Sequence, residues 1–293
     1  MNVFDRKAKL LQKNRALLAE NPVIYDYLKD EVGARLADRI FDINRKFPRV
    51  VEIGCGRGHV SKHVIEDCVD VLVMCDSSQL ALDQAALPEQ GVRVEKVVID
   101  EENLPFEDNS VDLVVSSLAL HWVNNLPATF SQVIKSLKPD CAFLGSVFGG
   151  DTLYELRSSL QLAETERVGG ISGHVSPFTD VRDIGGLLTQ AGFTLLTIDS
   201  DEIVVGYPSM FELMWDLKGM AENNCAWNRS LHMRRDVLLA AASIYQDMYG
   251  SEDRVPATFQ VLYFVAWKPD PSQPKPAKRG SATRSFKDLN SVK

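Results

Sequence analysis

The stretch VVEIGCGRGH, residues 50–59, decides which fold the rest of the chain is expected to adopt. A short apolar run rich in β-branched residues ends at Glu52-Ile53 and breaks into the loop G-x-G-x-G. Glycines there permit positive φ angles and let a ligand approach the backbone, and a helix that starts after the loop presents unpaired N–H groups. A tight turn between a strand and a helix would also explain the glycines, so the neighbouring residues are needed to separate the two interpretations.

Apolar runs of strand length recur along the chain, at residues 50–53, 71–74, 92–99, 111–115, 141–148, 193–198 and 258–267. Helical patterns separate the earlier runs, at residues 60–68, 79–87 and 127–137, and Lys138-Pro139-Asp140 marks a stop before the fifth run. Continuous apolar strands joined by helical crossovers predict an α/β fold, in which helices cover both faces of a seven-stranded parallel sheet.

The pattern changes after Gly150. Helices are expected at residues 152–167 and 181–191, and two more at 209–220 and 231–249, before the last strand. We therefore divide the chain into three parts: an N-terminal helical segment at 1–48, a domain at 49–267 with a helical insertion at about 200–255, and a flexible Pro-rich basic tail at 268–293.

Composition and charge exclude several classes of protein. The chain has 293 residues, 45% of them apolar, and a formal charge of −8, which are values of a globular protein rather than a disordered one. An acidic chain is a poor nonspecific binder of nucleic acid, and no run approaches the roughly 18 apolar residues that a membrane helix needs. The five cysteines form no C-x-x-C pair, which indicates a reducing compartment and argues against a disulfide framework or a structural zinc site.

The first 18 residues form a basic amphipathic segment, with five basic side chains against one acidic one. Leu10, Leu11, Leu17 and Leu18 recur on one helical face. One interpretation is a helix that docks on the surface of the domain, and the other is a membrane-surface or targeting helix.

Glu52 distinguishes the glycine loop from that of a dinucleotide site. Its negative charge would oppose a pyrophosphate but suits a cationic amino group, and His59 stands where a dinucleotide fingerprint has its third glycine. The pattern resembles the first motif of S-adenosylmethionine (SAM) methyltransferases, E/D-x-G-x-G-x-G. This resemblance implies a class I, Rossmann-like methyltransferase fold and SAM as the cofactor, held in part by Gly54, Gly56 and Gly58.

Two further acidic positions extend the resemblance. Asp76 ends the second strand, where it could accept hydrogen bonds from both ribose hydroxyls or could cap the following helix. The segment at residues 100–106, DEENLPF, resembles the family's D-x-x-x-L-P-F, which implies that Asp100 accepts from the adenine amino group and that the backbone of Glu101 meets the ring edge.

Candidate catalytic residues follow the fourth and fifth strands. Ser116 and His121 are expected near the sulfonium, because ligands of open parallel sheets bind beyond the carboxyl ends of the strands. His121 could act as a general base or simply pack beside Trp122. Tyr154 and Glu155 lie on the helix after the fifth strand, where a carboxylate could recognise a guanidinium or remain solvated. No histidine is followed by an acid two residues later, so no iron site of the facial-triad type is predicted.

Longer segments outside these motifs resemble the complex I assembly factor 5 family of mitochondria. They include NVFDR at residues 2–6, LALHWVN at 118–124, FGGDTLYELR at 148–157 and NCAWN at 224–228. The resemblance implies a protein of the mitochondrial matrix, peripheral to the inner membrane and without a transmembrane segment, that binds SAM. It further implies hydroxylation of an arginine in the quinone-module iron–sulfur subunit of NADH:ubiquinone oxidoreductase during early assembly, and no nucleic-acid partner.

The sequence is also compatible with two other functions. The core also resembles the carboxyl methyltransferase of biotin synthesis, which implies a SAM-dependent O-methyltransferase. A non-enzymatic chaperone that holds a partner subunit and binds SAM only structurally is the third interpretation. Members of the assembly-factor family carry a presequence ahead of the segment that matches residues 2–6, so the basic first helix could serve as a mitochondrial address.

Overall fold

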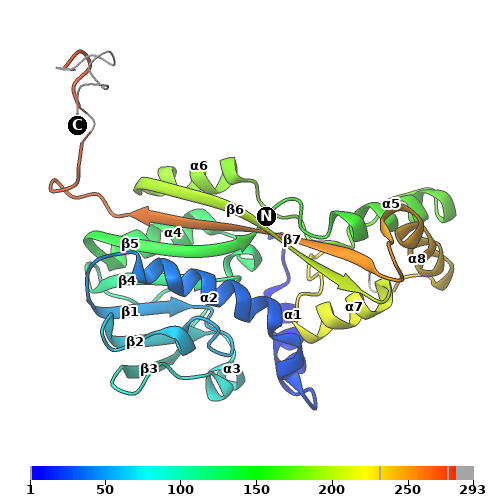
Figure 1. Cartoon of the computed structure of the whole chain (residues 1–293), viewed down its shortest axis with the longest axis horizontal. Helices are drawn as coiled ribbons and strands as arrows, with labels where there is room; N and C mark the ends of the chain where they lie inside the picture. The colour runs from blue at the N-terminus through cyan, green and yellow to red at the C-terminus, as the bar shows by residue number, and fades with distance from the viewer. Residues whose placement is uncertain (1, 231, 276, 282–293) are drawn as a thin grey trace, which may run out of the picture.

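The computed structural model describes residues 2–230, 232–275 and 277–281, and within them the chain forms one sheet of seven strands. The strands lie in the order β3-β2-β1-β4-β5-β7-β6 (Figure 1). Their bounds are β1 Phe47–Ile53, β2 Val69–Asp76, β3 Arg93–Val98, β4 Val111–Ser117, β5 Leu137–Phe148, β6 Thr194–Tyr207 and β7 Val255–Trp267. The predicted seven-stranded α/β sheet is confirmed, but it is mixed, because β7 pairs antiparallel with both β5 and β6.

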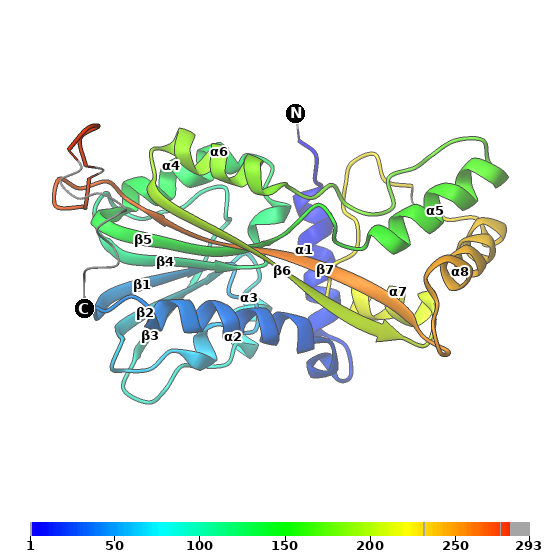
Figure 2. The ribbon, with the colours of Figure 1, turned by 45° about the horizontal axis from the view of Figure 1, so that its top comes forward.

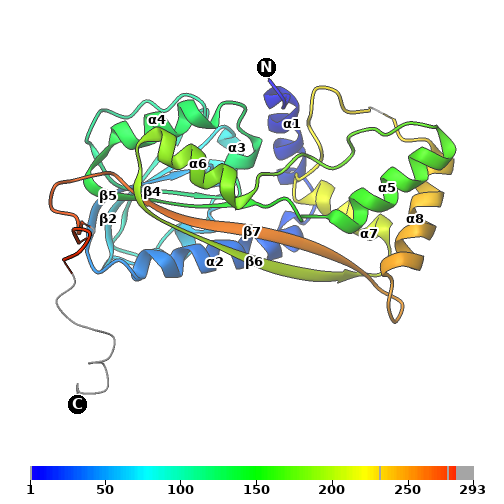
Figure 3. The same ribbon diagram turned by 90° about the horizontal axis from the view of Figure 1, so that it is seen from above.

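Helices cover both faces of the sheet, as Figure 3 shows: α2 lies below it, and α4 and α6 lie above it. The helices are α1 Arg6–Leu17, α2 Tyr27–Phe41, α3 Gln79–Gln84, α4 Leu126–Ser136, α5 Tyr154–Arg167, α6 Val181–Ala191, α7 Met210–Gly219 and α8 Arg235–Tyr249. Three short 3₁₀ turns are η1 Pro22–Tyr25, η2 Ser61–His63 and η3 Leu120–Trp122.

Successive residues of a strand point to opposite faces, which produces two separate apolar cores. Leu113 and Val115 of β4 belong to the core beneath α2, whereas Val114 between them belongs to the core beneath α4. All three side chains are almost fully buried. The strands are therefore apolar without alternation, which is the pattern of a sheet covered on both sides.

The last two strands extend well beyond the rest of the sheet. Figure 2 shows β6 and β7 running together away from β5 toward α5, α7 and α8. These three helices pack on the extended ends of β6 and β7, and α1 lies between them and the carboxyl ends of the parallel strands (Figure 3). The predicted helical insertion therefore forms one wall of a space at the edge of the sheet where a ligand is expected.

Three local expectations were wrong. Residues 60–68 hold only the turn Ser61–His63 instead of a helix, since buried β-branched Val64 adopts extended backbone directly after it. The helix α3 ends at Gln84, and Leu87 precedes a proline, which disfavours helical backbone. Residues 138–140 belong to β5, where Asp140 has a φ of 56° and the register with β4 shifts.

The division of the chain at residues 49 and 268 stays a prediction. Residue 276 and residues 282–293 of the predicted tail lie outside the described residues. Within the described ranges, no helix is long and apolar enough to cross a membrane.

Phe264 is expected to contribute strongly to stability. Its ring is 1% exposed, packs against Phe143 with ring centroids 5.0 Å apart, and lies over Gly145 of the neighbouring strand. Phe264→Ala should lower the free energy of unfolding by about 3–5 kcal/mol, because it leaves a cavity in the core. Urea titration followed by circular dichroism measures this, with Trp215→Ala as the control because Trp215 is 63% exposed. Equal losses in the two variants would contradict the packing described.

Candidate functional site

The glycine loop opens onto a cavity of about 230 Å³ at the carboxyl ends of the parallel strands. Gly54, Gly56 and Gly58 have φ angles of 70°, 55° and 80°, a backbone conformation that residues with a side chain rarely adopt. A Cβ atom on Gly58 would also lie 2.4 Å from the carbonyl oxygen of Ala86. Loop conformation and close packing therefore both require glycine at this position.

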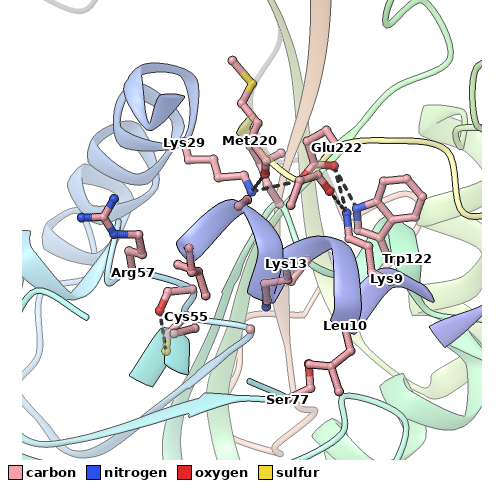
Figure 4. A pocket seen from close by; sticks show the side chains of 18 of the residues that line it. Lys9, Leu10, Lys13, Lys29, Cys55, Arg57, Ser77, Trp122, Met220 and Glu222 are labelled. Atoms are coloured by element: carbon pink, nitrogen blue, oxygen red, sulfur yellow. Dashed lines mark hydrogen bonds and ion pairs between the residues drawn. The ribbon is translucent and has the colours of Figure 1, made fainter. Parts of the chain in front are cut away.

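The helix α1 forms the other side of this cavity. Figure 4 shows Lys9, Leu10 and Lys13 projecting from α1 into the cavity above the glycine loop. Lys9 is buried, whereas Leu11 and Leu18 are 70% and 73% exposed. The helix thus docks on the domain through its basic side chains and half of the leucine stripe, since Leu17 is 8% exposed and Leu10 lines the cavity.

Asp76 lies at the end of β2 and is fully buried. Its two carboxylate oxygens accept hydrogen bonds from the Lys13 ammonium at 2.8 and 2.7 Å. The backbone N–H groups of Ser78 and Gly56 donate to the same carboxylate at 2.8 and 2.9 Å. Burial alone would lower the pKa of Lys13, but the charge of Asp76 raises it, so the pair stays ionic.

Arg6 makes the corresponding contacts at the next strand. Its guanidinium donates to Asp100 at 2.9 Å, to the carboxylate of Glu101, and to the backbone carbonyl of Trp122 at 3.2 Å. Glu101 is buried and Asp100 is half exposed. Two of the acids predicted to hold a nucleoside are therefore bonded to the same residue of α1.

Glu52 and Ser116 lie beneath the cavity rather than in its wall. Glu52 is 2% exposed and accepts a hydrogen bond from the Ser61 hydroxyl at 2.7 Å. Burial raises the pKa of its carboxyl to about 7, so the protonated form is favoured below neutral pH. The Ser116 hydroxyl is fully buried and donates to the carbonyl of Ile53 at 2.9 Å. Both residues support the loop from below, and their predicted contact with a cofactor stays a prediction.

The three candidate catalytic residues do not come together. His121 is buried next to Trp122, with its Nε2 atom 3.3 Å from Glu222. Glu155 is fully buried and accepts from the backbone and hydroxyl of Thr258 on β7, and Tyr154 is 42% exposed. Of these residues only His121 approaches the cavity, through its contact with Glu222.

Glu222 is the most important site residue that the sequence did not predict. Its buried carboxylate accepts a hydrogen bond from Trp122 Nε1 at 2.9 Å and lies 3.0 Å from the Lys29 ammonium and 3.5 Å from the Lys9 ammonium. Burial alone would raise the pKa of Glu222, but Lys9 and Lys29 hold it well below the usual value. The residue follows α7, inside the predicted insertion, and no local motif identifies it.

The spacing of the basic residues in α1 was the sequence signal from which these contacts could have been predicted. Arg6, Lys9 and Lys13 are separated by three and four residues, which places them on one helical face. That face meets the acids of the cavity, although charged faces of helices are normally solvated.

The donors and acceptors of this site fit SAM. The ammonium of Lys13 supplies two hydrogen bonds to the two oxygens of Asp76, as a pair of ribose hydroxyls would. Arg6 likewise supplies the N–H donors that an adenine amino group would bring to Asp100. The side chains of α1 therefore occupy the hydrogen-bonding positions that a nucleoside would need. Within the described residues no three His, Cys, Asp or Glu side chains are grouped so as to hold a metal ion.

Removing the Lys13 ammonium should strengthen binding of SAM. Lys13→Met leaves Asp76 without its cation, so the free protein should lose about 3 kcal/mol of stability, as when a buried pair is broken. The same change removes the competitor for Asp76, and the dissociation constant for SAM should fall about tenfold. Isothermal titration and thermal unfolding with and without SAM measure both effects. Lys46→Met removes the exposed pair with Asp70 and is the matched control; equal SAM affinity in Lys13→Met and wild type would contradict the assignment.

Glu52 should make stability depend on pH. Because the folded protein raises the pKa of Glu52 to about 7 from its ordinary value of 4.5, the folded state binds the proton more tightly than the unfolded state. Stability from this group is therefore complete below pH 4.5 and is lost as pH rises toward 7, by at most about 1.4 kcal/mol per pH unit. Glu52→Gln should lack this loss, so its stability relative to wild type should rise between pH 5 and about 7.5 in urea titrations. A constant difference across that range would contradict the burial argument.

Known proteins that are similar to this chain support the fold described above and indicate the family to which the chain belongs. A family model described as a methyltransferase domain matches residues 25–198. The mouse protein named arginine-hydroxylase NDUFAF5, mitochondrial, is 54% identical over 99% of this chain and 84% of its own length. A malonyl-[acyl-carrier protein] O-methyltransferase of Nitrosospira multiformis is 36% identical over 83% of both chains.

Solved structures show the same architecture. A putative methyltransferase of Bacillus halodurans superposes with a TM-score of 0.56 over 80% of this chain and 99% of its own, at 18% identity. The predicted class I SAM-methyltransferase fold is thereby confirmed. The chain belongs to the arginine-hydroxylase NDUFAF5 family, whose sequence similarity extends over the whole chain and beyond the methyltransferase domain.

Proposed function

We propose that this protein binds SAM and hydroxylates an arginine of the quinone-module iron–sulfur subunit of complex I during early assembly. The observation that carries the proposal is 53–54% identity over essentially the whole chain to proteins named arginine-hydroxylase NDUFAF5. The similarity includes residues outside the methyltransferase domain, where a shared fold alone would not preserve sequence. Those relatives are named mitochondrial, which supports a location in the mitochondrial matrix, peripheral to the inner membrane.

SAM would be held by the residues around the glycine loop. Asp76 would accept the ribose hydroxyls, Asp100 and Glu101 would receive the adenine edge, and the open backbone of Gly54 and Gly56 would let the methionine part pass. Bound SAM supplies a sulfonium-activated methyl group, whereas the oxygen atom of a hydroxylation would come from a separate oxidant such as molecular oxygen. The residues of α1 must first withdraw, since Lys13 and Arg6 fill the same acceptors.

A cationic protein partner suits the charge distribution. Between the basic N-terminal segment and the basic tail, the chain carries more acidic than basic side chains. Apart from the side chains of α1, the described lining of the first cavity has four acids, Asp26, Asp100, Glu101 and Glu222, against two cations, Lys29 and Arg57. Glu222 is held in its charged form. An arginine-bearing loop would therefore meet a complementary surface.

The similarity to malonyl-[acyl-carrier protein] O-methyltransferases supports a second candidate, SAM-dependent O-methylation. The two functions differ in the mass that they add to the product. Hydroxylation adds one oxygen atom, and methylation adds one carbon and two hydrogens.

Intact-mass and peptide mass spectrometry of the quinone-module subunit tests the proposal. Cells that lack the protein should have the unmodified arginine, and wild-type protein should restore a mass increase of one oxygen. Asp76→Asn should restore much less, because an amide offers one acceptor oxygen in place of two. Asp70→Asn, at an exposed position on the same strand, should restore the modification fully.

The other outcomes are equally informative. A methyl increment restored by wild-type protein would favour the methyltransferase candidate. An oxygen increment that persists in cells lacking the protein would contradict the hydroxylase. Normal complex I assembly with Asp76→Asn and an unmodified arginine would favour a chaperone.

A further inference from the structure

A second cavity of about 350 Å³ lies on the side of Glu222 that faces the helical wall. About half of the residues that line it are apolar, among them Leu156, Phe178 and Met214, and they come from α5, residues 173–178, α7 and residues 222–224, 229, 230 and 233. Arg229 also lines it and is paired with Asp5 at 3.4 Å. Glu222 is the single acidic residue among the described residues that line it. Glu222 also lines the first cavity, so its carboxylate stands in the wall that the two cavities share.

The carboxylate of Glu222 and two groups beside it form a site for a cation. The two groups are the face of the Trp122 ring and the backbone carbonyl of Ala221. The Lys9 ammonium occupies this site: it lies 3.5 Å from Glu222 Oε2, 3.7 Å from the centroid of the Trp122 ring and 2.5 Å from the Ala221 oxygen. Figure 4 shows Lys9 reaching from α1 toward Glu222 and Trp122.

A hydrogen bond and ring packing fix the orientation of the Trp122 side chain. Its Nε1 atom donates to Glu222 at 2.9 Å, so the carboxylate lies at the edge of the ring and leaves a face for the cation. His121 contacts Glu222 at 3.3 Å, and its ring packs against Trp122 and Phe148. Burial lowers the pKa of His121, which favours the neutral imidazole and leaves the negative charge to Glu222.

The Lys9 ammonium is a weaker partner for this site than a guanidinium would be. Burial lowers the pKa of Lys9 to about 7, although Glu222 opposes that shift. The carboxylate remains charged near neutral pH, but Lys9, one of its two ammonium partners, is then charged only part of the time. The other partner, Lys29, lies 3.0 Å from Glu222 Oε1, on the oxygen that Lys9 does not contact. A guanidinium keeps its charge at every physiological pH, donates in a planar fork that matches a carboxylate, and stacks on aromatic faces.

We propose that Glu222, the face of Trp122 and the carbonyl of Ala221 bind the guanidinium of the substrate arginine, and that Lys9 occupies this site until the substrate arrives. The inference rests on the proposed function and names the residues that select its substrate. The side chain enters through the second cavity, where Leu156, Phe178 and Met214 suit the methylene groups of arginine. The guanidinium then passes Glu222, which lines both cavities, and takes the position of the Lys9 ammonium on the side of the first cavity, where the nucleoside site lies.

Binding of a small probe to the full chain tests this without turnover. The probe is N-acetyl-L-arginine methylamide, and the corresponding citrulline compound is its uncharged counterpart. Lys9→Met should bind the arginine probe about tenfold more tightly than wild type, because the internal competitor is gone. Glu222→Gln should reduce its affinity about tenfold or more, since the charge-assisted hydrogen bonds are lost. The citrulline compound should bind weakly to all proteins.

Two further variants separate recognition from folding. Lys9→Met combined with Glu222→Gln removes the carboxylate together with its internal competitor, while Lys29 keeps its hydrogen bond to the Met220 carbonyl at 2.7 Å. Circular dichroism checks that this variant is folded like wild type, and it should fail to bind the arginine probe. Lys218→Met is the matched control, since Lys218 makes a surface contact with the Trp215 ring at 4.6 Å. Its affinity for the probe should equal that of wild type. Equal affinity in wild type, Lys9→Met and the double variant, or equal binding of the two probes, would overturn the inference.

Arginine modification of the quinone-module subunit, measured with the same variants, distinguishes this inference from the proposed function. If wild-type protein restores the modification and Glu222→Gln restores it equally, the guanidinium site is wrong and the hydroxylase stands. If the probe binds through Glu222 but wild-type protein never modifies the arginine, the hydroxylase is wrong and the cation site stands.

Discussion

The ion pair between Lys13 and Asp76 links the N-terminal helix to the sheet, and the arrangement of the site depends on it. Asp76 is fully buried at the end of β2, and a buried carboxylate needs charged or hydrogen-bonding partners to offset its lost hydration. Two backbone N–H groups and one ammonium supply them. Because that ammonium belongs to α1, the helix must cross the carboxyl edge of the parallel strands.

The same helix brings Arg6 and Lys9 to two further acidic positions, and each contact has a ligand that could replace it. Ribose hydroxyls and an adenine amino group would replace Lys13 and Arg6, and a substrate guanidinium would replace Lys9. A protein whose ligands bring hydrogen-bond donors and positive charge needs acids that are buried and ionised. When no ligand is bound, the basic helix α1 pairs with those acids and stabilises the fold. The acids of the cavity and the basic residues of the first segment therefore depend on each other.

The sheet and its glycine loop could be predicted from the sequence, because buried strands consist of continuous β-branched runs and the loop follows the first of them directly. The turn at residues 60–68 could not, since its buried valines resemble the apolar stripe of a helix. Docking of α1 on the domain was one of the two interpretations of its sequence, and the structure shows it. The leucines predicted an apolar contact, but only Leu10 and Leu17 face the domain, and the ion pairs are made by Arg6, Lys9 and Lys13. Lys9 contacts a carbonyl 212 residues away, and Lys13 contacts an acid 63 residues away, so no local pattern contains these pairs. Glu222 could not be predicted for the same reason.

A structure of the full chain bound to S-adenosylhomocysteine, the product form of the cofactor, would test the central claim most directly. The quantity to measure is the distance between Lys13 Nζ and the carboxylate of Asp76, which is 2.7–2.8 Å in the free protein. The account predicts that this contact is broken and that both oxygens of Asp76 accept the ribose hydroxyls instead. A bound nucleoside with the Lys13–Asp76 contact unchanged would contradict it.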